Sequence, residues 1–337
     1  MQQYVVYGLR LSYFTRKLEA ALELTGVPFE SRAKTMSVRE EVERRANTHQ
    51  IPVLHTPEDW MIADSTPLLD LLDGRHPYRR LFPAGPAGVL VHVVEELFDE
   101  WVPRTAVHFR WQYSESENVA APAMAEETVP DADPSSRNAF ATAIADWGRR
   151  ACRATGVSEE TQQRAAEAEL DGLLEALEAQ LARTPYALGS RPTAVDAVLL
   201  GALRAHFLND PTPSARYGKL ERVRAWALRT HAWDGTGELP PFPETTPFGQ
   251  RALEVVAQQY RPFVLANARA LAAGDKAFTA TTYGEEVSYR TRPYPERSRQ
   301  MVRGRVAHRL DSAERREVDA WLQAHGLAEV FGAGTAS

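Results

Sequence analysis

An α/β domain over residues 1–82, followed by an all-helical domain and a C-terminal extension, is the fold class that the sequence predicts. Three observations support it. Short apolar runs alternate with helical patterns in residues 1–82, a segment rich in Pro and Gly follows at residues 82–88, and strand patterns then stop. The chain has 337 residues, which is long enough for more than one domain.

The first domain is expected to follow the order βαβαββα. YVVY is typical of a short buried strand, and the helical pattern after it ends at Gly26 and Pro28. FESRAK is expected to be the second strand. Ser37 and Glu40 have capping-box spacing at the start of a charged helix. PVLHT and WMIA predict a hairpin around residues 57–59. This order is that of the thioredoxin fold.

Residues 88–235 carry the helical domain. A leucine stripe in AELDGLLEALEAQL marks one helix, and Thr193 with Asp196 has the N-cap and N3 spacing that begins another. The acidic segment at residues 114–136 contains six acidic residues and no basic one, together with several Pro and Ala residues. Such a composition favours a solvated loop or a short flexible insertion.

The extension covers residues 240–337. PFGQRALEVVAQQYRPFVLANARALAAG predicts a long helix bent by Pro262. FTATTY and EVSYRT are expected to pair as a hairpin around Gly284, and SAERREVDAWLQAHG predicts a closing helix.

Charge and composition exclude several function classes. The formal net charge is -6, which disfavours general nucleic-acid binding, because phosphate recognition needs a basic surface. Cys152 is the single cysteine, so the chain has no CxxC pair and no internal disulfide, as is typical of a reducing cytoplasm. The N-terminus does not have a signal-peptide pattern, and no apolar run has the length of a membrane span. We therefore expect a cytoplasmic protein that uses neither membrane nor nucleic acid as a partner.

Three stretches in order are the most informative feature of the chain. LSYFTRKLEAAL places Ser12 at a strand-to-helix turn, QIPVL follows about forty residues later by the numbering, and IADSTPLLDLLD comes next. Together they resemble the cytosolic-type glutathione S-transferase family, with the Ser-type active-site motif. The resemblance extends over about residues 4–235 and leaves the extension outside the family pattern.

The resemblance implies a glutathione transferase in which a hydroxyl activates the glutathione thiol. A thiol with a pKa near 8.5 is only a few per cent ionised at neutral pH, and the thiolate is the reactive form. Ser12 matches the hydroxyl position at the helix start, and Tyr7, at the end of the first strand, is the alternative. The alternative is a purely structural role, in which Ser12 is an ordinary helix N-cap and Tyr7 is a buried aromatic residue of the strand.

The same resemblance implies a glutathione-binding set. Pro52 matches a cis-proline that leaves the backbone of Ile51 free to pair with the cysteinyl part of glutathione, and Gln50 matches a contact to the glycyl carboxylate. Asp64 and Ser65 match the pair that holds the γ-glutamyl end, although the family often has Glu at the first of these positions. Lys34 and His49 are further candidates for contact with the glycyl carboxylate, with a surface position as the simpler expectation.

A small hydrophobic electrophile is the second substrate that the resemblance implies. Tyr13, His108, Trp111 and Tyr113 are the candidate pocket residues, with core packing as the alternative for each. A role in detoxification, glutathione as co-substrate without a metal, and a two-fold homodimer are further implications of the family. The alternative function, from a different class, is a non-catalytic binding or scaffold protein that acts through its C-terminal extension.

Overall fold

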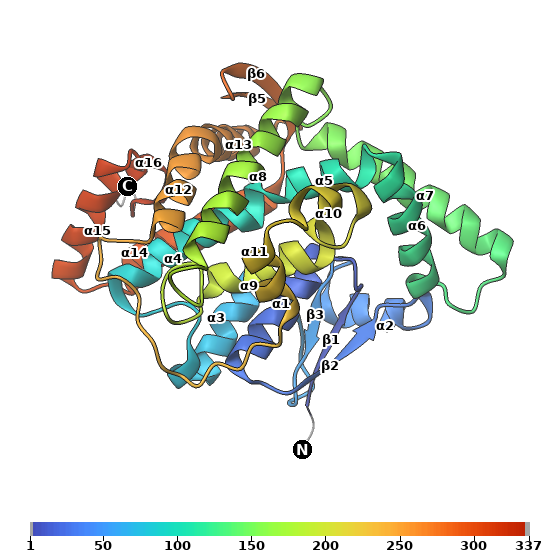
Figure 1. The fold of residues 1–337 in the computed structure, drawn as a ribbon, viewed down its shortest axis with the longest axis horizontal. Helices are drawn as coiled ribbons and strands as arrows, with labels where there is room; N and C mark the ends of the chain where they lie inside the picture. The colour runs from blue at the N-terminus through green and yellow to red at the C-terminus, as the bar shows by residue number, and fades with distance from the viewer. Residues whose placement is uncertain (1–2, 334–337) are drawn as a thin grey trace. The chain divides into compact units, whose positions relative to one another are not determined.

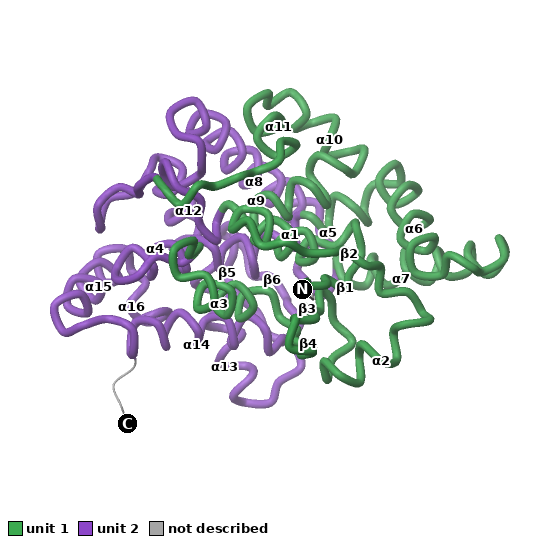
Figure 2. Tube along the Cα trace, turned by 90° about the horizontal axis from the view of Figure 1, so that it is seen from below, with its two compact units in different colours: residues 1–81, 106–152, 196–236 green, residues 82–105, 153–195, 237–337 purple. Residues whose placement is uncertain are grey.

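The structure is a computed structural model that describes residues 3–333. The chain divides into two compact units, each composed of three separate stretches of sequence (Figure 2). Unit 1 comprises Met1–Leu81, Ala106–Cys152 and Asp196–Thr236. Unit 2 comprises Phe82–Thr105, Arg153–Val195 and Gly237–Ser337. The linear division at residues 1–82, 88–235 and 240–337 stays a prediction.

Unit 1 begins with an α/β substructure in the predicted order βαβαββα (Figure 1). Its elements are β1 (Tyr4–Gly8), α1 (Tyr13–Thr25), β2 (Phe29–Ala33), α2 (Met36–Ala46), β3 (Val53–His55), β4 (Met61–Ala63), α3 (Ser65–Arg75) and the short 3-10 helix η1 (Pro77–Arg79).

The sheet has the strand order β2-β1-β3-β4, with β1 and β2 parallel and the other pairs antiparallel. Alternate residues of β1 point to opposite faces of the sheet. Val5 and Tyr7 pack with Val42 of α2 on one face. Helices α1 and α3 pack against each other, and α1 contacts β1. Figure 1 shows α2 on one side of the sheet and α1 with α3 on the other.

The start of α2 differs from the prediction. The helix begins at Met36 after Thr35, and no side chain caps it, so the capping box expected from Ser37 and Glu40 is wrong. The Ser37 hydroxyl instead hydrogen-bonds the Thr35 hydroxyl at 2.7 Å. Ser37 therefore lies inside the first turn rather than at the position before it.

The remaining elements of unit 1 are helical. They are α6 (Ser114–Thr128), the π-helical turn η3 (Leu203–Phe207), α10 (Pro211–Tyr217) and α11 (Glu221–Leu228). Helices α5 (Pro103–Trp111), α7 (Pro134–Ala154) and α9 (Ala194–Ala202) each continue from one unit into the other. The start of α9 immediately after Thr193 agrees with the predicted helix start.

The acidic segment at residues 114–136 is not a loop, so that expectation is wrong. Most of it forms α6, with Pro122 inside the helix, and its end begins α7. Side-chain contacts anchor the start of α6, because Ser116 donates a hydrogen bond to Thr212 of α10 at 3.0 Å and accepts one from the Thr212 N–H at 3.2 Å. Tertiary contacts thus outweigh a composition that favours disorder.

Unit 2 is mostly helical and carries a separate hairpin. Its elements are α4 (Gly85–Glu96), the π-helical turn η2 (Leu97–Trp101), α8 (Glu160–Gln180), α12 (Pro247–Val255), the π-helical turn η4 (Val256–Tyr260), α13 (Arg261–Ala273), β5 (Ala277–Thr282), β6 (Glu285–Arg290), α14 (Pro293–His308), α15 (Ser312–Ala324) and α16 (Ala328–Phe331). Helix α4 packs against α12, α14 and α15.

The predicted hairpin and closing helix are present in unit 2. Tyr283 and Gly284, both with positive φ, connect β5 to β6, which is the geometry that matches the twist of a tight hairpin. The predicted long helix is divided into α12 and α13 by η4, directly before Pro262. None of the helices in the described part of the chain is long and apolar enough to cross a membrane.

Candidate thiol site

The sheet of unit 1 brings distant parts of the sequence to one edge. Tyr7, Val53 and Ala63 lie in one row across β1, β3 and β4. Because β3 runs antiparallel to both neighbours, the end of β1, the start of β3 and the end of β4 all meet at the same edge of the sheet.

The predicted thiol-site residues follow from this row. The turn that contains Ser12 comes after β1, Pro52 comes directly before β3, and Asp64 and Ser65 come directly after β4. The three stretches that the sequence singled out therefore gather at one edge of the sheet. The N-termini of α1 and α3 begin there, so their free backbone N–H groups favour anionic groups at this edge.

Ser12 is the N-cap of α1, with extended backbone geometry, and its Oγ accepts the Thr15 N–H at 3.3 Å. This is the structural role expected of a Ser at a helix start. A serine hydroxyl has two acceptor lone pairs and one donor hydrogen. The N-cap bond uses one lone pair, so Ser12 retains an O–H with which to donate to a thiolate.

Tyr7 is directed to the other face of the sheet. Its ring is buried in the cluster with Val5, Val42 and Val53, and its hydroxyl accepts a 3.5 Å hydrogen bond from Arg32 on the neighbouring strand. Ser12 is half-buried at the helix start, whereas Tyr7 is 9% exposed. The geometry favours Ser12 as the hydroxyl that meets a ligand at this edge.

The loop before β3 has the backbone geometry that the resemblance implies. The Ile51–Pro52 peptide bond is cis. Gln50 is exposed and its side chain hydrogen-bonds His49 at 3.0 Å. Lys34 is buried rather than superficial, and its Nζ donates to the His49 carbonyl at 2.8 Å, so it ties this loop to the end of β2.

Asp64 has an unusual backbone, with φ 79° and ψ 111°. Positive φ is disfavoured for a residue with a Cβ, and a sparsely populated conformation costs on the order of 1–3 kcal/mol. Asp64 precedes α3, yet its side chain does not cap that helix. The ordinary N-cap reading therefore does not account for Asp64. Ser65 is buried at the first position of α3.

Lys17 is a buried contact that sequence reasoning missed. It lies on α1 with no exposed surface, and its Nζ donates to Thr66 Oγ1 at 2.8 Å. Thr66 follows Ser65 in the first turn of α3. The bond fixes the start of α3 relative to α1, and thereby the Asp64–Ser65 pair relative to Ser12. In the sequence, the signal for this contact is a Lys on the apolar face of a predicted helix.

The predicted electrophile residues lie mainly in the interior of unit 1. Tyr13, His108 and Trp111 are each at most 4% exposed. Tyr13 packs near His206, with ring centroids 5.9 Å apart, and Trp111 packs against Gly148 of α7. The half-buried Tyr113 has its ring 5.4 Å from that of His108. Of the four, Tyr113 has the exposure needed to meet a substrate.

A buried ion pair also reaches the Ser12 turn. Arg110 makes two hydrogen bonds to Asp210, at 2.9 and 3.0 Å, and donates to the Leu11 carbonyl at 2.6 Å. Burial, and then the charge of Arg110, lower the pKa of neighbouring His206 to about 4, so this imidazole is neutral at neutral pH. The Arg110 guanidinium therefore connects the Leu11 carbonyl of the turn to Asp210.

Comparison with known families decides the identity of this fold. The glutathione S-transferase N-terminal domain family matches residues 6–80, and the glutathione S-transferase C-terminal domain family matches residues 141–229. The chain belongs to the glutathione S-transferase family. The family and the fold class expected from the sequence are confirmed.

Solved structures with a similar fold include other members of this family. A glutathione S-transferase from Rhodospirillum rubrum F11 is 16% identical, with a TM-score of 0.45, and the match covers 74% of this chain and 99% of that one. A glutathione S-transferase from Methylobacterium radiotolerans, in complex with glutathione sulfonate, is 22% identical, with a TM-score of 0.41 and coverage of 71% and 100%. No curated protein matches the sequence significantly.

Unit 2 of this glutathione S-transferase holds a different kind of cluster. His92, Glu95 and Glu96 are buried on α4, and one ligand-type atom from each lies within 4.8 Å of the others. Arg305 donates from Nε to His92 Nδ1 at 3.2 Å. This bond places His92 Nδ1 in a hydrogen-bonded charge network with Arg305.

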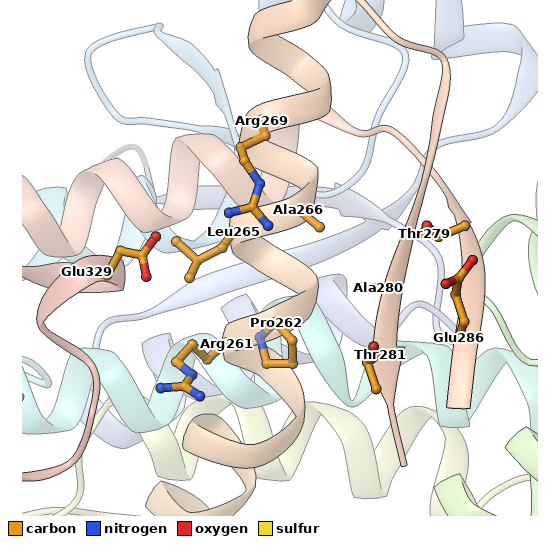
Figure 3. A pocket seen from close by; sticks show the side chains of 10 residues that line it. All are labelled: Arg261, Pro262, Leu265, Ala266, Arg269, Thr279, Ala280, Thr281, Glu286 and Glu329. Atoms are coloured by element: carbon orange, nitrogen blue, oxygen red, sulfur yellow. The ribbon is translucent and has the colours of Figure 1, made fainter. Parts of the chain in front are cut away.

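A hollow in unit 2 lies between α13 and β5 (Figure 3). Its volume is about 470 Å³. Figure 3 shows Arg261, Arg269 and Leu265 on α13, with Thr281 and Glu286 on the hairpin. None of the residues that line this hollow belongs to the predicted thiol site.

Proposed function

We propose that the protein binds glutathione at the sheet edge of unit 1 and activates its thiol for attack on a small hydrophobic electrophile. The observation that carries the proposal is the convergence of the Ser12 turn, the cis-Pro52 loop and the Asp64–Ser65 pair at one edge. The strained backbone at Asp64, whose side chain makes no capping hydrogen bond to α3, supports a ligand-binding role for that carboxylate.

Each group has a stated task in this proposal. The Asp64 carboxylate binds the α-ammonium of the γ-glutamyl end, and Ser65 with the N-terminus of α3 binds the α-carboxylate. The backbone of Ile51 pairs with the cysteinyl part, and Gln50 meets the glycyl carboxylate. Lowering the thiol pKa by two units corresponds to about 2.7 kcal/mol of preferential thiolate stabilisation. The Ser12 O–H and the N-terminus of α1 supply this stabilisation.

The reaction is a nucleophilic addition or displacement. The thiol proton goes to solvent, the sulfur electron pair forms a bond to the electrophilic carbon, and either a leaving group departs with its electron pair or the acceptor takes up a proton. Tyr113 is the residue we propose first for contact with the electrophile. Tyr13, His108 and Trp111 support that region from the interior of unit 1.

Calorimetric titration with glutathione tests the binding proposal. Wild-type protein is expected to bind saturably, and Asp64→Ala to bind at least about 10-fold more weakly, because a charge-assisted hydrogen bond contributes about 1.5–3 kcal/mol. S-methylglutathione is expected to bind without needing Ser12. Absence of binding at millimolar glutathione would favour the scaffold function instead.

Removal of each candidate hydroxyl separates catalysis from binding. Ser12→Ala is expected to lower kcat/KM at least about 10-fold with a model electrophile, while glutathione still binds, because the Ser12 hydroxyl supplies part of the about 2.7 kcal/mol of thiolate stabilisation and the N-terminus of α1 supplies the rest. Tyr7→Phe is the matched control and is expected to retain activity. A Tyr7→Phe variant that loses activity while Ser12→Ala keeps it would reverse the assignment. The homodimer, the cytoplasmic location and the detoxification role stay predictions.

A further inference from the structure

The turn that presents Ser12 is held by a side chain from the acidic segment. The Arg10 N–H donates to both carboxylate oxygens of Glu127, at 2.8 and 3.1 Å. On the other side of the same residue, Arg16 Nε donates to the Arg10 carbonyl at 3.0 Å. The Ser12 N–H donates to the Leu9 carbonyl at 2.9 Å and closes the turn. Both backbone polar groups of Arg10 are therefore fixed.

Helix α6 is anchored so that its last turn reaches this site. Ser116 attaches the start of α6 to Thr212 of α10, and Glu127 attaches its end to the turn. Glu126, the adjacent acidic residue, is exposed. Of these two neighbouring carboxylates, Glu127 is the one that contacts the turn. The acidic segment therefore does more than face solvent, because Glu127 makes a specific contact with the Ser12 turn.

We propose that Glu127 is a positioning residue of the thiol site: by accepting the Arg10 N–H, its carboxylate fixes the turn that aims the Ser12 hydroxyl at the glutathione thiol. This inference rests on the proposed function. Donors that stabilise a developing charge are effective only when the surrounding structure holds them in place before reaction. A turn whose Arg10 N–H has lost its acceptor would allow Ser12 to move away from the thiolate.

The electrostatics of Glu127 agree with a role other than stability. Burial raises the pKa of Glu127, while the hydrogen bond from the Arg10 N–H and the charges of Arg10 and Arg16 lower it and the charge of Glu19 on α1 raises it, leaving it above its usual value. With a raised folded-state pKa, the stabilising effect of the protonated form is complete below the unfolded pKa and is lost as pH rises through the folded pKa. The ionised form, which accepts the stronger hydrogen bond, is thus kept at a cost to folding.

The test measures the pKa of the bound glutathione thiol by its thiolate ultraviolet absorbance as a function of pH. Glu127→Ala is expected to raise that pKa by about one unit, from about 6.5 to about 7.5, which is about 3-fold less thiolate at neutral pH, while the glutathione Kd changes less than about 3-fold. Glu127→Gln keeps an acceptor oxygen and is expected to stay close to wild type. Glu126→Ala is the matched control on the same helix and is expected to change neither quantity.

The outcomes separate this inference from the proposed function. If wild-type protein does not bind glutathione, the proposed function fails and this inference fails with it. If wild-type protein binds and ionises glutathione but Glu127→Ala and Glu126→Ala give the same thiol pKa, only the role of Glu127 is overturned. Glu127→Asp, whose arm is one methylene shorter, replaces the alanine variant if circular dichroism shows that Glu127→Ala does not fold, and the same increase in thiol pKa is then expected.

Discussion

Both units bury arginines, but each unit uses them on different partners. In unit 1, the buried Arg110 pairs with Asp210 and also donates to the backbone carbonyl of Leu11, next to Ser12. In unit 2, the buried Arg305 donates to the His92 side chain. The first arginine fixes the backbone of the turn that contains Ser12, whereas the second takes part in a network of side chains.

Because the partners of the buried arginines differ, we expect substitutions in the two units to differ in effect: some should affect chemistry and others only folding. A second unit 2 network has the same character as the first: Arg104 lies 3.5 Å above the Trp101 ring, Trp101 donates to Glu169 at 2.9 Å, and Arg104 lies 3.6 Å from Glu169. We expect charge changes in unit 1 to alter the thiol site, and those in unit 2 to alter the free energy of unfolding alone.

The largest expected effect is that of Arg110→Ala. The substitution leaves Asp210 as a buried charge without its guanidinium and removes the donor to the carbonyls of Leu11 and Ala205. Breaking a buried ion pair in this way costs about 3–5 kcal/mol. Urea unfolding measures the loss. Arg149→Ala, which removes an arginine that is 47% exposed, is the control and is expected to cost less than about 1 kcal/mol.

An Arg110→Ala loss no greater than that of Arg149→Ala would contradict the view that the first arginine holds unit 1 together. Arg110 would then differ from the arginines of unit 2 only in its contact with the Ser12 turn. Glutathione binding by the folded Arg110→Ala variant would show whether the hydrogen bond to the Leu11 carbonyl matters for the site.

A smaller effect is expected from two glycines, with opposite signs. A Cβ at Gly148 on α7 would lie 2.2 Å from the Trp111 ring, so Gly148→Ala is expected to cost about 1–3 kcal/mol through overpacking. Gly304 on α14 has open space around the position of a Cβ, so Gly304→Ala is expected to stabilise by about 0.5–1 kcal/mol. Thermal unfolding of both variants tests the prediction. A stabilising Gly148→Ala would show that Trp111 moves easily.

Local signals predicted the elements of the site and missed its supports. Ser12 and Pro52 were found because each lies in a short motif whose neighbours specify a turn or a strand start. Glu127 was hidden in a segment whose acidity and proline favour disorder, and its partner Arg10 lies 117 residues away. Helix α6 forms there because of contacts at both ends, which no local pattern records.

The burial of charge was the other property that the sequence did not reveal. Lys34 was expected at the surface, yet it is buried and pairs with Glu43 at 2.8 Å, which holds the pKa of that carboxyl below its usual value. On the arginine-rich helix α14, Arg299 is buried and donates to the Val330 carbonyl at 2.9 Å. Composition gives the number of charges, while packing decides which of them are buried.

The last prediction concerns Glu96 of unit 2 and appears as a dependence on pH. Burial, and then the charge of Glu100, raise the pKa of Glu96 well above its usual value, although Ser298 and Tyr260 donate hydrogen bonds to it. The folded protein therefore keeps Glu96 protonated at pH values where the unfolded chain releases the proton. The resulting stability is complete below the unfolded pKa of about 4.3 and is lost as pH rises through the folded pKa.

Glu96→Gln is neutral at every pH and avoids that loss. The difference in unfolding free energy between this variant and wild type is expected to increase in favour of the variant from about pH 4.3 upwards, because the wild type alone loses stability there. Urea unfolding at a series of pH values measures it, with Glu175→Gln on the exposed side of α8 as the control. If Glu96→Gln also changes the pKa of the bound glutathione thiol, then the charges of unit 2 act on the site, and the contrast between the two units fails.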